Sequence, residues 1–390
     1  MGRLTQTEIQ ELAKQVEFPC ISLYMPTEKA GAETRENSIR FKNLLTEAKT
    51  KLSQLEAESE LSTSMETAES YLENHDFWQH QETGLAFFIN QEGVKYYRLD
   101  RDCSELIIVS DRFYLNPLLS VINENHQFYL LALAQNQVQL FLGDRDRLNQ
   151  VQLPENVPVS LAEALKYDDP EKQTQYHSGE PGNDPIYHGQ GVGTTDNKNE
   201  IRRFLQQISN GIESAFEAQN VPLILAGVEY LLPIYRETNS YQNLLEAEIT
   251  GNPEHVAPEA LHSQAEEIMA TQLDDVKQTA MDDYQRLAAT NETSDNLTEI
   301  VAAAAKGQVD TLFMVANRQQ WGSFDLQNYQ VELHDTPSQD SLELYNFAAV
   351  KTYLQSGKVY FLESDQMPEN ASIAAIMRYP IYAEVEKVTA

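Results

Sequence analysis

Residues 167–198 form a polar stretch of Asp, Pro, Gly, Gln, His and Thr with almost no aliphatic side chains. Such a segment cannot bury a hydrophobic core, so the chain has to fold on either side of it. A stretch of roughly thirty residues without secondary structure is uncommon within a domain, and is either functional or disordered. We therefore expect a long exposed loop at this place.

The sequence on either side alternates between helical and strand-like patterns of apolar residues, which predicts a mixed α/β and α+β fold. The changes in pattern predict three domains: an N-terminal α+β domain over residues 1–120, a central α/β domain over 121–258 and a C-terminal α/β domain over 259–390. The predicted helices cover residues 5–16, 34–58, 197–216, 259–290, 297–306 and 341–354. The predicted strands cover residues 18–25, 85–90, 94–99, 105–109, 113–115, 128–134, 138–142, 221–228, 309–316, 359–362 and 373–377.

Some of these helices carry predicted end signals. Thr5 with Glu8, and Asn197 with Glu200, have the spacing of capping boxes at helix starts. Gly307 and Gly357 are predicted to end the helices before them.

The chain carries 60 acidic and 28 basic side chains, a formal charge of −32, and each third of it is acidic. Duplex DNA is then a poor partner, because affinity without sequence preference comes from Lys and Arg on phosphates.

The two cysteines, Cys20 and Cys103, stand in apolar, strand-like contexts and cannot form a disulfide framework. No apolar run reaches the length of a membrane span, and the N-terminus does not read as a signal peptide. We expect a cytoplasmic protein that binds neither DNA nor membranes.

Common catalytic and nucleotide-binding motifs are absent from the sequence, and no cofactor is predicted. In the polar loop, His177, Asp184 and His188 have irregular spacing, which favours solvated side chains over a metal site. Gly189-Gln190-Gly191 has two interpretations. It is either an ordinary glycine-rich turn or a flexible tip that presents one amide, which can orient a water molecule and stabilise an oxyanion.

The order of several short phrases along the chain resembles the archaeal and eukaryotic class-one peptide-release-factor superfamily, which includes the Pelota-type ribosome-rescue proteins, and is most similar to its bacterial branch. The phrases are 21–27 (ISLYMPT), 40–45 (RFKNLL), the glycine–glutamine loop leading into 201–204 (IRRF), 223–230 (LILAGVEY) and 307–313 (GQVDTLF). The resemblance implies a decoding-site-like first domain, an RNase-H-like second domain that carries the loop, and a ribosomal-protein-like third domain that docks a translational GTPase.

The resemblance also implies roles for individual residues. Gly189 and Gln190 match the second Gly and the Gln of the Gly-Gly-Gln tripeptide that positions water against the peptidyl-tRNA ester, and Gly191 would be a further hinge. His188 replaces the first Gly, and its Cβ restricts the backbone. The basic residues implied near ribosomal RNA are Lys198, Arg202 and Arg203 after the loop and Arg35, Arg40 and Lys42 on the first long helix. Each of the three on the long helix is also compatible with an ordinary solvated helix surface.

The resemblance thus points to a ribosome-associated factor that rescues stalled ribosomes by binding the A site. Two classes remain open within it: an enzyme that hydrolyses peptidyl-tRNA through Gln190, and a factor without chemistry that protects idle ribosomes. The Asn-Ile-Lys-Ser tetrapeptide that reads stop codons has no match, so reading of stop codons is not expected. A third possibility is an acidic protein-interaction module outside translation.

Overall fold

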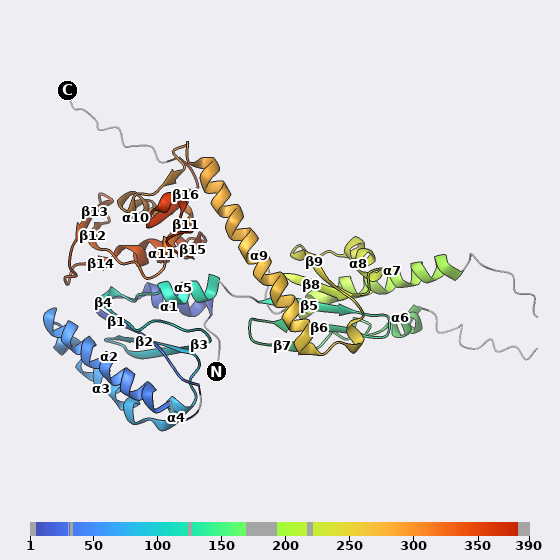
Figure 1. Ribbon diagram of the computed structural model, residues 1–390, viewed down its shortest axis with the longest axis horizontal. Coiled ribbons are helices and arrows are strands. Elements are labelled where there is room, and N and C mark those ends of the chain that lie inside the picture. Colours follow the sequence, from blue (N-terminus) through green and yellow to red (C-terminus); the bar gives the residue numbers. More distant parts are fainter. Residues whose placement is uncertain are drawn as a thin grey trace, which may run out of the picture. The chain divides into compact units, whose positions relative to one another are not determined.

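The computed structural model describes residues 5–29, 31, 34–123, 127–168, 193–216 and 221–380. Its contacts divide the chain into two compact units, Met1–Glu124 with Lys277–Ala390, and Asn125–Val276 (Figure 1). Each unit combines helices with sheets, which confirms the expected mixed class. None of the described helices is both long and apolar enough to cross a membrane. The division into three domains stays a prediction.

The N-terminal part of the first unit is built around an antiparallel sheet of order β3-β2-β1-β4. Its helices and strands are α1 (Gln6–Lys14), β1 (Val16–Pro26), α2 (Thr34–Gln54), α3 (Ser62–Ser70), α4 (His75–Gln79), β2 (Gly84–Asn90), β3 (Gly93–Leu99), β4 (Leu106–Arg112) and α5 (Asn116–Asn123), with short 3₁₀ turns at Glu58–Leu61 and Tyr71–Glu73.

Strand β1 lies in the middle of this sheet and is buried on both faces, because successive side chains of a strand point to opposite sides. Leu23 belongs to the cluster under α2, together with Phe41 of that helix. Tyr24, the next residue, belongs to the opposite cluster, which also contains Leu118 of α5. This two-sided burial explains why the strand is an almost continuous apolar run in the sequence.

The C-terminal part of the first unit contains a sheet of order β10-β16-β11-β15 and a three-stranded sheet of order β13-β12-β14. Its elements are the end of α9 (Pro258–Leu287), β10 (Thr293–Ser294), α10 (Leu297–Ala305), β11 (Val309–Val315), β12 (Trp321–Asp325), β13 (Gln330–His334), β14 (Leu342–Glu343), α11 (Leu344–Leu354), β15 (Lys358–Leu362), a 3₁₀ turn (Pro368–Asn370) and β16 (Ile373–Met377).

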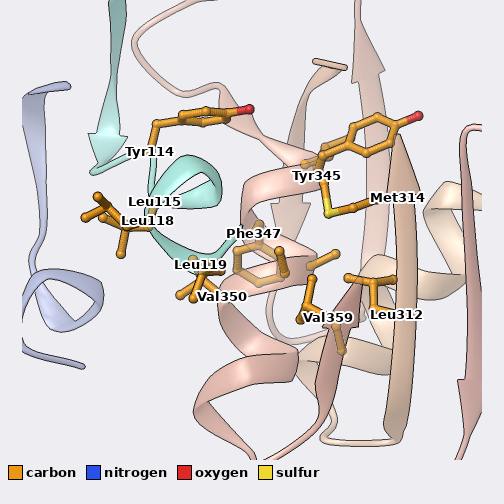
Figure 2. Close-up of a cluster of buried hydrophobic side chains, with 14 of the residues drawn as sticks. Tyr114, Leu115, Leu118, Leu119, Leu312, Met314, Tyr345, Phe347, Val350 and Val359 are labelled. Atoms are coloured by element: carbon orange, nitrogen blue, oxygen red, sulfur yellow. The ribbon is translucent and has the colours of Figure 1, made fainter. Parts of the chain in front are cut away.

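The two parts of the first unit share one hydrophobic core. Leu115, directly before α5, and Leu118 and Leu119 within it lie against Phe347 and Val350 of α11 (Figure 2). All five side chains belong to a single buried cluster, although more than two hundred residues of sequence separate the two elements. The first and last thirds of the chain therefore fold together.

The second unit contains a five-stranded sheet of order β7-β6-β5-β8-β9. Strands β5, β6 and β7 are antiparallel neighbours, whereas β8 and β9 run parallel to β5. Helices α7 and α8 pack on one face and the start of α9 on the other. The elements are β5 (Phe128–Leu133), β6 (Val138–Gly143), β7 (Leu148–Val151), α6 (Leu161–Asp168), α7 (Gly193–Ile212), a 3₁₀ turn (Glu213–Ala215), β8 (Leu223–Gly227), α8 (Leu231–Thr238), β9 (Leu244–Thr250) and a 3₁₀ turn (Pro253–His255).

Several predicted element ends are wrong. The helix predicted over 34–58 ends at Gln54, and Glu56 beyond it has a left-handed φ of 54°. The helix predicted to start at Asn197 begins at Gly193. Helix α11 begins at Leu344 rather than 341, because Ser341 precedes the short strand β14.

Residues 113–115, predicted as a strand, have none of the sheet pairing expected of one. Side chains take the place of strand partners: the Tyr114 N–H donates to Ser22 Oγ over 2.9 Å, and the Leu115 N–H donates to Asn346 Oδ1 over 2.7 Å. Cys103 likewise lies outside the strands, whereas Cys20 lies within β1 as predicted.

Three further end signals can be compared with the structure. Gly307 has a φ of 75° after α10, and the reciprocal Thr5–Glu8 hydrogen bonds at α1 are present, so both predictions are confirmed. After α11 the left-handed residue is Ser356, with a φ of 60°, and not Gly357. Gly357 is needed there for another reason: a Cβ on it would lie 2.5 Å from Thr352 Cγ2.

Candidate functional site

The predicted glycine–glutamine loop belongs to the second unit, between α6 and α7. His188, Gly189, Gln190 and Gly191 lie outside the described residues, as do His177 and Asp184, so their roles stay predictions. Helices α6 and α7 pack together and lie at the same end of the five-stranded sheet (Figure 1). The described chain therefore holds both elements that flank the loop in one place.

Helix α7 is anchored along one side by apolar side chains at helical spacing. Those buried in its cluster are Ile201, Phe204, Leu205, Ile208 and Ile212. The Ser209 hydroxyl donates to the Thr238 carbonyl of α8 over 2.9 Å, and a Cβ on Gly211 would lie 2.5 Å from Val157 Cγ2. Close packing on this side fixes which side chains of α7 face solvent.

The solvent side of α7 carries the three cations predicted after the loop. Lys198, Arg202 and Arg203 are exposed, and one carboxylate, that of Glu200, stands between them in the sequence. Arg202 Nη2 lies 3.2 Å from Glu237 Oε2 of α8, with both side chains 59% exposed. An exposed pair of this kind contributes about 0–1 kcal/mol, so Arg202 is only loosely held. Residues 193–203 thus carry three basic and two acidic side chains, Asp196 and Glu200, a small positive excess in an acidic chain.

The basic residues predicted on α2 belong to the first unit and differ among themselves. Arg35 and Lys42 are exposed and, seven residues apart, share one side of the helix. Arg40 is half-buried: its Nε lies 3.0 Å from Glu105 Oε1, and its Nη1 donates to the Pro26 carbonyl over 2.8 Å. Arg40 therefore holds α2 against the end of β1, a structural role that the pattern of charges did not indicate.

Neither cysteine has the properties of a nucleophile. Burial raises the pKa of the Cys20 thiol to about 12 and that of Cys103 to about 11. Both are thiols at neutral pH, and the thiolate is the reactive form. Among the described residues, no group of three or more His, Cys, Asp or Glu could hold a metal ion.

Glu343 is an ionisable residue that the sequence analysis missed. It is 2% exposed and caps α11, where its carboxylate accepts hydrogen bonds from the N–H groups of Gln320, Tyr345 and Asn346. Burial raises its pKa to about 7, although the three N–H donors act in the opposite direction. One available signal was its place directly before residues 344–350, a mostly apolar segment that contains one polar residue, Asn346, because helix caps are expected directly before such a segment.

The match to a protein family concerns the second unit. Residues 128–271 match the family model of bacterial archaeo-eukaryotic release factor family 7. This match confirms the resemblance to the bacterial branch of that superfamily. No curated protein matches the sequence.

Several solved structures are similar over much of the chain, at low identity and TM-scores below 0.5. The archaeal translation termination factor aRF1 is 14% identical, with 97% of this chain and 99% of that chain covered and a TM-score of 0.23. Dom34 of S. cerevisiae is 13% identical, with 76% and 80% covered and a TM-score of 0.39. Ribosome-bound archaeal Pelota is 9% identical, with 98% and 96% covered and a TM-score of 0.42.

Proposed function

With residues 128–271 matched to bacterial archaeo-eukaryotic release factor family 7, we propose that this protein is a ribosome-associated translation factor that rescues stalled ribosomes by binding in the A site. The main support for the proposal is that the matched residues, 128–271, include the whole polar stretch and α7. The strand order β7-β6-β5-β8-β9, with three antiparallel strands followed by two parallel ones, supports an RNase-H-like description of this unit.

The solvent side of α7 supports contact with ribosomal RNA. Lys198, Arg202 and Arg203 present positive charge beside the loop, on a helix whose opposite side is locked into the core. RNA phosphates attract such cations, and the exposed Glu237 partner of Arg202 can be exchanged for a phosphate at little cost. The net charge of −32 opposes approach to RNA elsewhere on the surface and favours contact through this helix.

Co-sedimentation with stalled and empty bacterial ribosomes, over a range of salt concentrations, tests the proposal. We expect binding that weakens steeply with salt, because each neutralised phosphate releases counterions. Changing Lys198, Arg202 and Arg203 together to Gln should reduce the slope of log affinity against log salt by about 2–3, because each neutralised phosphate contributes about 0.7–0.9 to that slope.

The matched control is a variant in which the exposed Lys14, Arg145 and Lys358 are all changed to Gln. It makes the same change in net charge at residues outside α7. Its salt slope should stay that of the unmodified protein. Absence of binding to either kind of ribosome would contradict the proposal and favour an interaction module outside translation. Salt-insensitive binding would also contradict the RNA contact, because apolar protein interfaces depend little on salt.

We further propose that Gln190 orients the water that hydrolyses the peptidyl-tRNA ester. The ribosome already activates this ester, so a positioned amide and a positioned water suffice. Gln190→Ala should then lower single-turnover peptide release from stalled complexes by about 10² or more, with ribosome binding nearly unchanged. Gln206→Ala, at an exposed position of α7, is the matched control.

His188 favours a second function, protection of idle ribosomes without chemistry. A side chain at this position restricts the backbone where the release-factor tripeptide has its first Gly. His188→Gly distinguishes the two functions: release that is absent from the unmodified protein and gained by the variant would indicate a binding factor. Release by the unmodified protein that Gln190→Ala abolishes would indicate an enzyme.

We also propose a translational GTPase as a partner of residues 259–390. Because these residues share a core with the N-terminal part, the pull-down should use the full chain rather than an isolated C-terminal domain. Recovery of a translational GTPase is expected in the presence of a non-hydrolysable GTP analogue. Failure to recover one under conditions that retain ribosomes would contradict this partner.

A further inference from the structure

The first unit contains a cavity of about 180 Å³, about six times the volume that one water molecule occupies in the liquid. It is lined by β1, the segment between β3 and β4, the start of α5, the turn after β11, and β15. Apolar and aromatic residues supply one part of the wall, among them Leu99, Tyr114 and Phe361. Arg101, Asp102 and Asn116 supply polar groups.

Asn116 is the feature of this wall that points to a ligand. It is 4% exposed, and its Oδ1 has no hydrogen-bond partner. Its Nδ2 donates to the Tyr114 hydroxyl over 3.3 Å. Reversing the amide would give Oδ1 the Tyr114 partner and leave Nδ2 without one, so one polar atom stays unpaired in either orientation. Buried polar groups are nearly always paired, and this one lies on the wall of a cavity large enough to hold a partner.

The charges around the cavity restrict what the partner can be. Arg101 and Asp102 contribute one positive and one negative side chain to the wall, so the wall has no net formal charge. The strongly acidic chain disfavours an anion at any site without a clear excess of cations. An uncharged molecule that combines a hydrogen-bonding edge with an apolar face fits this wall best.

We propose that the cavity binds an uncharged planar heterocycle, a nucleobase presented as a free nucleoside. The hydrogen-bonding edge of the base pairs with the Asn116 amide. Asn side chains distinguish base edges through hydrogen bonds of this kind. The ring of the base packs among the aromatic side chains of the wall, which accept any base because every base has a π face. This site lies in the first unit, is independent of the polar loop, and does not depend on the function proposed above.

Isothermal titration calorimetry of the full chain with adenosine, guanosine, cytidine and uridine tests the proposal. At least one nucleoside should bind at one site per chain, with a dissociation constant of about 0.1–1 mM for a ligand of this size. Asn116→Leu should weaken binding by about tenfold or more, because it removes the polar atoms that meet the base. The same variant should not unfold the protein, since it also removes the unpaired buried atom.

A second variant tests the site without altering the buried amide. Ser104→Trp places a large side chain at an exposed position of the wall and should abolish binding, whereas Ser59→Trp, at an exposed position away from the cavity, should leave it unchanged. Absence of binding by all four nucleosides up to about 5 mM would overturn the proposal and indicate that water alone satisfies Asn116. Binding that both Asn116→Leu and Ser104→Trp leave intact would overturn it equally.

Discussion

Glu343 shows how one buried carboxyl can set the pH dependence of stability. Burial raises its pKa from 4.5 to about 7 in the folded protein, so the folded chain holds a proton that the unfolded chain has released between those values. Stability from this group is therefore fully present below about pH 4.5 and is lost as the pH rises to about 7. At ~1.4 kcal/mol for each pKa unit, the loss is on the order of 3 kcal/mol.

Glu343→Gln should remove most of this pH dependence, because the amide stays neutral throughout. Urea unfolding between about pH 5 and 8 should show the free energy of unfolding of the unmodified protein falling by on the order of 3 kcal/mol, and that of the variant by much less. Glu332→Gln, at an exposed position of β13, should keep the unmodified slope. Equal slopes for the protein and Glu343→Gln would contradict a raised pKa at this residue.

At the scale of elements, several helices and strands with a clear apolar period were predicted from the sequence, but others with such a period, α5 and α8 among them, were not. Helices α9 and α10 and strands β5, β6 and β16 lie close to where their patterns placed them. Strands β12 and β13 form a largely exposed hairpin with few buried apolar residues, and were missed for that reason. Residues 113–115 were wrongly predicted as a strand. Their apolar composition does not reveal that the side chains of Ser22 and Asn346, and not a neighbouring strand, accept their backbone hydrogen bonds.

Asn346 is the side chain that joins α11 to this irregular segment. Its Oδ1 accepts from the Leu115 N–H over 2.7 Å, and its Nδ2 donates to the Phe113 carbonyl over 3.0 Å, all within the buried core. Asn346→Ala would leave two buried backbone groups unpaired, at about 1–3 kcal/mol each. We expect denaturant unfolding to report a decrease in stability of ~2–5 kcal/mol for this variant.

The control for that measurement is Asn43→Ala, an exposed position on α2, which should change stability by less than about 0.5 kcal/mol. A decrease of similar size in both variants would mean that the Asn346 hydrogen bonds contribute little to joining the two elements.

At the scale of the whole molecule, the candidate site could be predicted only in part. The polar stretch 167–198 was visible as a break in composition, but Gly189, Gln190 and Gly191 lie outside the described residues and their role stays a prediction. Lys198, Arg202 and Arg203, in α7, are exposed. The structural role of Arg40 was not visible, because a pattern of charges does not reveal the Glu105 and Pro26 partners. The core shared by the first and last thirds of the chain was hidden for a related reason: apolar periodicity identifies a buried face but not what covers it.

This shared core predicts how fragments of the chain behave. Residues 1–124 alone would expose the apolar side of α5, including Leu118, and residues 277–390 alone would expose that of α11, including Phe347. Exposed patches of this kind drive aggregation or association. We expect each fragment expressed alone to aggregate or stay partly unfolded, and the two expressed together to co-elute as one complex in size-exclusion chromatography.

The control is the fragment of residues 125–276, which has its own buried clusters and should fold separately. Independent, monomeric folding of residues 277–390 would instead favour three separate domains, because a domain with a complete core needs no cover from the N-terminal part.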